Sequence, residues 1–367
     1  MQASTRIWRH FDVWLLAAVT LLTIAGVALI QSAIAGNIEL QDYPARQARF
    51  AAIGMLVLLA FAAIDYRMWS ALARPIYVVT VLLLLGILTA GLVRFGAARW
   101  FQVGTLFIQP SEVAKVTTIL ILANYLARHQ HEIGEIKTVL RSLLLVSVPT
   151  LLIFLQPDLD TTVIVAASWL ALTWAAGMRP KHIGMLMLVG LVTPLLAWPL
   201  LQPYQQGRII QFLFPNPQAQ YGDTYNVNQA LIAIGSGGWF GEGYGAGSQT
   251  QLRFLKVRHS DFIFSVLSEE FGFVGAVLAL ALLVFVIYRC VRAARLARDT
   301  FGALICYGVA TLLLLQVGFN VAMNLNLIPV SGLTLPFLSY GGSSILATLA
   351  SIGLVESVVL RQKRIEF

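Results

Sequence analysis

The stretch Val13–Ile30, VWLLAAVTLLTIAGVALI, carries no charged residue. An uncharged apolar run of about 18 residues or more is typical of a transmembrane helix. No clean small-residue cleavage site follows it, and similar apolar runs recur along the chain. We therefore interpret it as a retained first membrane span rather than a cleaved signal peptide.

The composition of the whole chain agrees with this interpretation. Of 367 residues, 58% are hydrophobic and only 11% are charged, whereas soluble domains carry about 25% charged residues. The sequence thus predicts an all-α polytopic membrane protein, a single membrane domain over residues 1–367. About ten transmembrane helices are expected, at residues 12–34, 48–66, 75–93, 110–127, 140–156, 160–178, 183–201, 262–288, 302–324 and 338–360.

The lysines and arginines predict the orientation of these spans. With both termini cytoplasmic, 16 of the 25 cations fall in cytoplasmic segments and nine do not, as the positive-inside rule favours. The net charge of +8 is explained by short loops between spans, so it does not indicate a nucleic-acid partner. The two cysteines, Cys290 and Cys306, imply neither a disulfide framework nor a metal site.

This orientation places a large extracytoplasmic loop, at about residues 201–262, between the seventh and eighth helices. Four cations lie in it, although cations are sparse on that side of a membrane. They are Arg208, Arg253, Lys256 and Arg258. The loop ends at a carboxylate, Asp261, beside Arg258 and His259. A cationic loop that closes on a carboxylate indicates a site for an anionic, lipid-linked substrate and for acid/base chemistry.

Two further polar groups lie beside spans, where ionisable residues are costly and usually functional. Glu112 and Lys115 are three residues apart, so they share one helix face. They are either a neutralised pair that eases membrane insertion or part of a polar cavity. Asp158 and Asp160 follow Pro157; helix capping accounts for one of them, and the second is a candidate ligand for a divalent cation.

The glycine-rich segment at residues 234–243, IGSGGWFGEG, allows two interpretations. Glycines let the backbone approach a ligand, and runs of free N–H groups bind anions. A plain re-entrant turn requires the same residues.

Taken together, these blocks resemble the SEDS family (shape, elongation, division and sporulation), and within it the RodA type. The resemblance rests on Arg99-Trp100, Gln109-Pro110-Ser111-Glu112 with Lys115, Gln156-Pro157-Asp158, Tyr204-Gln205 with Arg208, Gln229 with Ile232–Gly238, His259 with Asp261–Phe264, and Leu335-Pro336 with Ser339–Ser344. Gly247–Leu252 looks more like RodA than like the division paralogue FtsW. Two departures are Ser260, where the family usually has threonine, and Leu255-Lys256-Val257, where it usually has Leu-Pro-Glu.

The resemblance implies a peptidoglycan glycosyltransferase of the bacterial plasma membrane. Such an enzyme polymerises lipid II, for cell elongation and rod shape in the RodA type. It implies a class B penicillin-binding protein as partner, which supplies transpeptidation.

For such an enzyme Asp261 is our candidate general base, a role worth about 10²–10⁴-fold in rate. Burial should raise its pKa, whereas Arg258 and Lys115 should lower it. Glu112 and Lys115 are expected to support the site. The predicted substrate-binding residues are Arg99, Trp100, Gln205, Arg208, Gln229, Arg258 and His259, the arginines because they hold phosphate by paired donors.

A divalent cation, Mg²⁺ or Mn²⁺, is a candidate cofactor, with Asp261, Asp158 and Asp160 as candidate ligands, although no ligand set in the sequence requires one. Three alternatives to a RodA-type glycosyltransferase stay open: a lipid II flippase, a structural scaffold, and the FtsW-type division enzyme.

Overall fold

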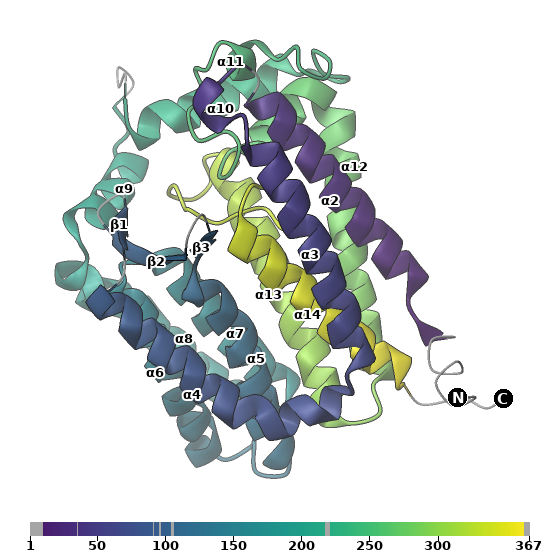
Figure 1. Cartoon of the computed structure of the whole chain (residues 1–367). Helices are drawn as coiled ribbons and strands as arrows, with labels where there is room; N and C mark the ends of the chain where they lie inside the picture. Colours follow the sequence, from purple (N-terminus) through teal and green to yellow (C-terminus); the bar gives the residue numbers. More distant parts are fainter. Residues whose placement is uncertain are drawn as a thin grey trace.

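The computed structural model describes residues 10–34, 36–90, 92–94, 97–103, 106–216 and 221–362. Within these ranges a helix lies at each of the ten predicted spans (Figure 1). They are α2 (Val13–Ala33), α3 (Tyr43–Ala63), α4 (Tyr66–Ala90), α5 (Pro110–Arg128), α6 (Ile136–Leu155), α7 (Leu159–Ala175), α8 (Pro180–Ala197), α12 (Ile263–Leu296), α13 (Thr300–Asn324) and α14 (Gly342–Leu360). Seven helices of the described chain are long and apolar enough to cross a membrane. The prediction of a helical, multi-span membrane protein is confirmed.

The predicted loop between α8 and α12 contains helices of its own. Beyond η3 (Trp198–Leu200) lie α9 (Pro203–Leu213), α10 (Asp223–Ser236) and α11 (Ser248–Gln251). They sit at one end of the helix bundle (Figure 1). Another short 3-10 helix, η2 (Ile38–Leu40), joins α2 to α3.

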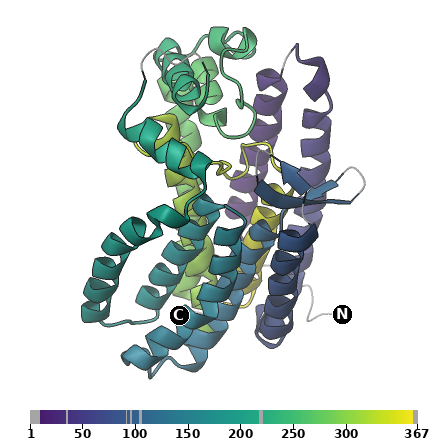
Figure 2. The ribbon, with the colours of Figure 1, turned by 90° about the vertical axis from the view of Figure 1, so that its left-hand side faces the viewer.

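A small antiparallel sheet, which the sequence did not predict, lies between α4 and α5. Its strands are β1 (Leu92–Arg94), β2 (Ala97–Val103) and β3 (Leu106–Ile108), in the order β1-β2-β3. Leu92 pairs with Trp100, and Phe101 with Ile108. Figure 2 shows the sheet at the same end of the bundle as α9 and α10.

Small residues bring α3 and α14 into close contact. A Cβ atom on Gly353 would lie 2.5 Å from the carbonyl oxygen of Leu58, and one on Gly54 would lie 2.5 Å from Leu349. Small residues at such interfaces let helix backbones approach closely in a membrane. The first and last parts of the chain are therefore packed against each other.

The glycine-rich segment packs against a break in α12. Gly272 interrupts this helix with φ of 66°. The N–H of Phe273 donates to the carbonyl of Gly238 at 2.8 Å, and the N–H of Glu242 donates to that of Glu269 at 2.9 Å. The segment thus satisfies backbone groups that the break leaves free. The structure thus gives these glycines a packing role, and anion binding by the segment stays a prediction.

A buried charged cluster joins the other ends of three helices. Arg289 of α12 donates to Asp12 at 2.7 Å, and the N–H of Asp12 donates to Glu356 of α14 at 3.1 Å. Asp12 also caps α2, because its carboxylate accepts from the N–H of Leu15. α2 therefore begins on the side of the bundle where α14 ends. The neighbouring Cys290 and Cys306 are buried free thiols.

Candidate active site

Asp261 lies half-buried, two residues before α12 begins at Ile263. Burial raises the pKa of its carboxyl from 3.8 to about 6, and the carboxylates of Asp160 and Asp223 also raise it. A hydrogen bond from Ser260 and the charge of Arg208 oppose this rise. Burial thus outweighs the cation. The cation that acts on Asp261 is Arg208, not Arg258 or Lys115, the two expected from the sequence.

Arg208 is the charged centre of the site. It projects from α9, where its Nε lies 3.3 Å from the carboxylate of Asp223 on α10. Its Nη1 lies 3.9 Å from the carboxylate of Asp160 on α7. The guanidinium also lies over the ring of Tyr204, 5.7 Å from its centroid. Arg208 therefore links α7, α9 and α10.

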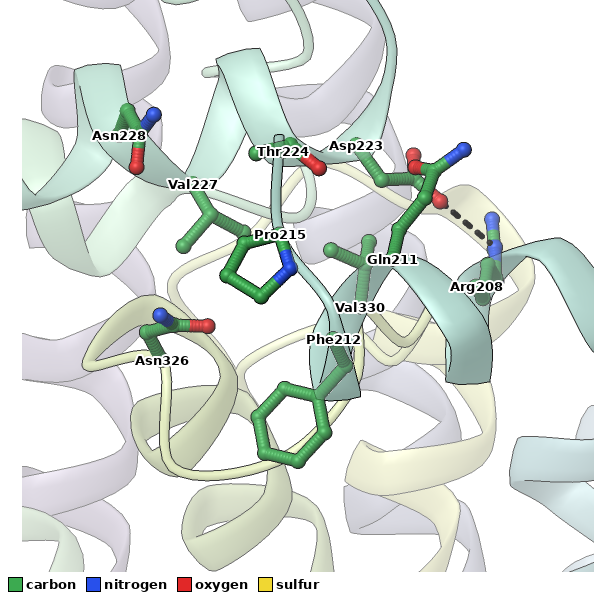
Figure 3. Close-up of a pocket in the computed structure, with 10 residues that line it drawn as sticks. All are labelled: Arg208, Gln211, Phe212, Pro215, Asp223, Thr224, Val227, Asn228, Asn326 and Val330. Carbon is green, nitrogen blue, oxygen red and sulfur yellow. Dashed lines mark ion pairs between the residues drawn. The ribbon is translucent and has the colours of Figure 1, made fainter. Parts of the chain in front are cut away.

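Two cavities meet at Arg208. The larger, of about 240 Å³, is lined by Arg99, Pro157, Leu159, Asp160, Tyr204, Gln205, Arg208, Ile209, Phe319, Ile328, Pro329, Val330 and Ser331. The smaller, of about 30 Å³, lies between α9, α10 and the segment after α13 (Figure 3). Figure 3 shows Gln211, Asn228 and Asn326 around it, with the ion pair from Arg208 to Asp223 at its edge. The larger cavity combines cations with apolar side chains.

Arg99 forms one wall of the larger cavity and is held by the turn before α7. It donates to the backbone carbonyls of Gln156 and Pro157, and to the hydroxyl of Tyr204 at 2.7 Å. Its Nη1 lies 3.9 Å from Asp158. These contacts fix the guanidinium at the cavity wall.

The two aspartates after Pro157 have separate roles. Asp158 caps α7 by accepting from the N–H of Thr161, and it accepts from Ser111 at 3.3 Å. Asp160 accepts from the N–H of Gly332 at 2.9 Å and faces Arg208. Among the described residues, no group of three or more His, Cys, Asp or Glu side chains could hold a metal ion. The candidate ligands Asp158, Asp160 and Asp261 therefore do not form a metal site by themselves, and we assign no step to a cation.

Glu112 and Lys115 form a buried ion pair within the first turns of α5. The distance from Lys115 Nζ to Glu112 Oε1 is 2.9 Å. Neither residue lines the two cavities described above. The mutual pairing expected from their spacing is present, and their supporting role stays a prediction.

Arg258 and His259 fix the loop rather than line these cavities. Arg258 donates to the carbonyl of Ala33, at the end of α2, and to that of Leu255 at 3.0 Å. Burial lowers its pKa. His259 lies edge-on to Tyr43 and Tyr340, and burial together with Arg258 lowers its pKa to about 4. The imidazole is therefore neutral at pH 7.

The remaining predicted binding residues are divided between the site and its surroundings. Gln205 is buried and lines the larger cavity; its Oε1 accepts from the N–H of Gln202. Its Nε2 has no hydrogen-bond partner within the described chain, so it is free to donate to a ligand. Trp100 is half-buried in β2 and Gln229 half-buried in α10, and neither lines the two cavities.

Comparison with known proteins shows the family to which the chain belongs. A family model described as "Cell cycle protein", covering FtsW, RodA and SpoVE, matches residues 10–364. The chain belongs to this SEDS family. It is 35% identical over 355 residues to the peptidoglycan glycosyltransferase MrdB of Escherichia coli K12, covering 96% of this chain and 95% of MrdB. It is also 35% identical to a probable peptidoglycan glycosyltransferase FtsW of Coxiella burnetii, covering 97% and 98% of the two chains.

Similar solved structures support the same family assignment. A chain from a study of a peptidoglycan synthase complex that polymerises and crosslinks matches with a TM-score of 0.82 at 31% identity, covering 95% of this chain and 97% of that one. RodA of Thermus thermophilus matches with a TM-score of 0.73 at 30% identity, covering 96% and 98%. The expected family and enzyme class, a SEDS peptidoglycan glycosyltransferase, are confirmed.

Several residues of this SEDS site were missed by sequence reasoning. Asp223 pairs with Arg208 across two helices, and no local spacing pointed to that contact. Asn320 and Asn324 of α13 both donate to the backbone carbonyl of Asp261. The sequence could have indicated these two residues, since two amide side chains one turn apart in an apolar span are unusual.

Proposed function

We propose that this SEDS protein polymerises lipid II, with Asp261 as the general base. The observation that carries the proposal is the environment of the Asp261 carboxyl. Burial raises its pKa to about 6, and it lies within electrostatic range of Arg208 and Asp160, two residues that line the cavity of about 240 Å³. A base with a pKa near the working pH is deprotonated yet still basic enough to accept a proton.

The proposed reaction is a single displacement at a sugar carbon. The 4-hydroxyl of one substrate attacks the anomeric carbon of the other, and Asp261 accepts the hydroxyl proton. The bond from that carbon to the polyprenyl diphosphate breaks, and the diphosphate leaves with the electron pair. Arg99 and Arg208 line the larger cavity and would neutralise the leaving charge, since arginine donates to phosphate in pairs.

The apolar wall of the same cavity supports a lipid-linked substrate. Ile209, Phe319 and Ile328 line it together with the cations, so the same cavity offers charged groups for a diphosphate and apolar groups for the start of its polyprenyl chain. Gln205 Nε2 would donate to a sugar or peptide group. No contact described above supports Arg258, Trp100, His259 or Gln229 as ligands, so their binding roles stay predictions.

The cellular role proposed is that of the RodA type. The site faces the extracytoplasmic side of the plasma membrane, and both termini are cytoplasmic. A class B penicillin-binding protein is the proposed partner, in line with the similar chain from a complex that combines polymerisation and crosslinking. FtsW relatives have similar identity, so localisation at the side wall or at midcell decides between elongation and division.

The test is a gel assay with labelled lipid II, using the purified protein with its partner. The parent should produce glycan strands, and Asp261→Asn should lower the rate by about 10²–10⁴-fold because the base is lost. Asp42→Asn is the control, because that carboxylate is 78% exposed in its side chain and lies outside the cavities.

A moenomycin-type inhibitor should leave the parent active, as the family resemblance implies. If Asp261→Asn polymerises at the parental rate, the role of the base is wrong. If the parent moves lipid II across vesicles without joining it, the protein is a flippase instead.

A further inference from the structure

Three consecutive backbone carbonyls, at His259, Ser260 and Asp261, are held by hydrogen bonds from α13 and from the segment before α14. The N–H of Tyr340 donates to His259 at 2.9 Å. The hydroxyl of Ser339 donates to Ser260 at 2.6 Å. The backbone that carries the general base is thus fixed at every one of these positions.

The carbonyl of Asp261 is held most firmly. It accepts from Asn320 Nδ2 at 3.0 Å and from Asn324 Nδ2 at 3.1 Å. Both asparagines lie one turn apart on α13 and are 0% exposed. The hydrogen bonds of α12 begin at the next carbonyl, that of Phe262. The asparagine pair therefore supplies donors where the helix supplies none.

The two amides are themselves oriented. The hydroxyl of Ser265, in the first turn of α12, donates to Asn324 Oδ1 at 2.6 Å. Asn324 Nδ2 must then point to its acceptors, which are the carbonyls of Asp261 and Asn320. Asn320 Nδ2 also binds the carbonyl of Leu333 at 2.8 Å. The arrangement connects the base to α12, α13 and the 331–341 segment.

We propose that Asn320 and Asn324 are positioning residues for glycosyl transfer, which hold the backbone of Asp261 and thereby fix the position of its carboxyl relative to Arg208. This inference rests on the proposed function. A displacement of about 1 Å at a catalytic group costs about 10²-fold in rate, so a fixed backbone affects turnover rather than substrate binding. A pair that served stability alone would leave the kinetic constants of the folded protein unchanged.

The test measures initial polymerisation rates over a range of lipid II concentrations, with the full-length protein and its partner. Asn320→Leu and Asn324→Leu should each lower kcat by about 10- to 100-fold, with KM changed by less than about twofold. Ser265→Ala, which removes only the orienting hydroxyl, should lower kcat by a smaller factor. Ser339→Thr keeps its hydroxyl and should retain more kcat than Ser339→Ala.

Gln316→Leu is the matched control. Gln316 is buried one turn earlier on α13, and no hydrogen bond joins it to residues 259–261. This variant should keep the parental kcat, and the thermal unfolding midpoint in detergent identifies variants that are folded.

Each outcome has one consequence. Folded asparagine variants with parental kcat, or with a change confined to KM, overturn the positioning role. If both leucine variants fail to fold, an unchanged kcat in Ser265→Ala overturns it. If the parent makes no strands where a control polymerase does, the proposed function fails rather than this inference.

Discussion

At the scale of single residues, one cation is shared by three carboxylates. Arg208 pairs with Asp160 and Asp223, and its charge also acts on Asp261. Burial is the largest cause of the raised pKa of Asp261, so the neighbouring charges adjust a value that is already high. The charge balance of the site is therefore sensitive to each of the four side chains.

This balance predicts a pH dependence. The base must be deprotonated, so kcat/KM should fall as the pH drops below about 6, the pKa of Asp261. Asp223→Asn removes a negative charge that raises this pKa, so the midpoint should move to lower pH. Arg208→Gln removes a positive charge that lowers it, so the midpoint should move to higher pH. The pH profiles of the parent and both variants check the directions, and opposite shifts would contradict the assignment of the base.

The sequence could indicate Asp261 as a candidate because the signal is local, with basic neighbours at the end of a span; its role stays a prediction. It did not identify the cation beside Asp261, because Arg258 binds the carbonyl of Ala33, 225 residues away in the chain. The contact between Arg208 and Asp223 likewise depends on the fold of the loop between α8 and α12. The sequence thus shows which residue types lie near one another along the chain, but it does not show where long side chains such as those of Arg258 and Arg208 point.

At the scale of elements, the helices at the ten predicted spans were predictable because runs of mostly apolar residues mark them, although only seven of these helices are both long and apolar enough to cross a membrane. The sheet β1-β2-β3 was not, since its short strands lie in the connection between two spans. The glycine-rich segment was recognised, but its partner was not, because the break at Gly272 has no distinct sequence pattern.

This packing predicts which glycines are essential. A Cβ on Gly237 would lie 2.0 Å from the carbonyl oxygen of Ser268, and one on Gly241 would lie 2.2 Å from that of Glu270. Gly241 also has a φ of +82°. Gly237→Ala and Gly241→Ala should each destabilise the protein by about 1–3 kcal/mol or more.

Gly235→Ala is the control, because nothing lies within 4 Å of its added Cβ. Thermal unfolding in detergent measures the difference. Equal midpoints for all three variants would show that the segment does not pack on α12 in this way.

At the scale of the whole molecule, the proposed orientation gives a labelling prediction. Cys290 and Cys306 are buried, so a membrane-impermeant maleimide should not reach them in intact cells. Lys256 and Lys137 are exposed; Lys256 lies in the segment before α12, and Lys137 lies in the first turn of α6. Lys256→Cys should be labelled from outside the cell, and Lys137→Cys only after the membrane is opened. The reverse pattern would invert the orientation.

The contact between α3 and α14 has a consequence for biosynthesis. Chains emerge N-terminus first at about 5–20 residues per second, so the helix that carries Gly54 and Leu58 enters the bilayer on the order of tens of seconds before its partner with Leu349 and Gly353 exists. Until then the residues of α3 that contact α14 lack this partner. Assembly of this pair thus waits for α14, and a nascent chain stopped ahead of α14 would leave α3 open to the wrong neighbour or to a membrane protease.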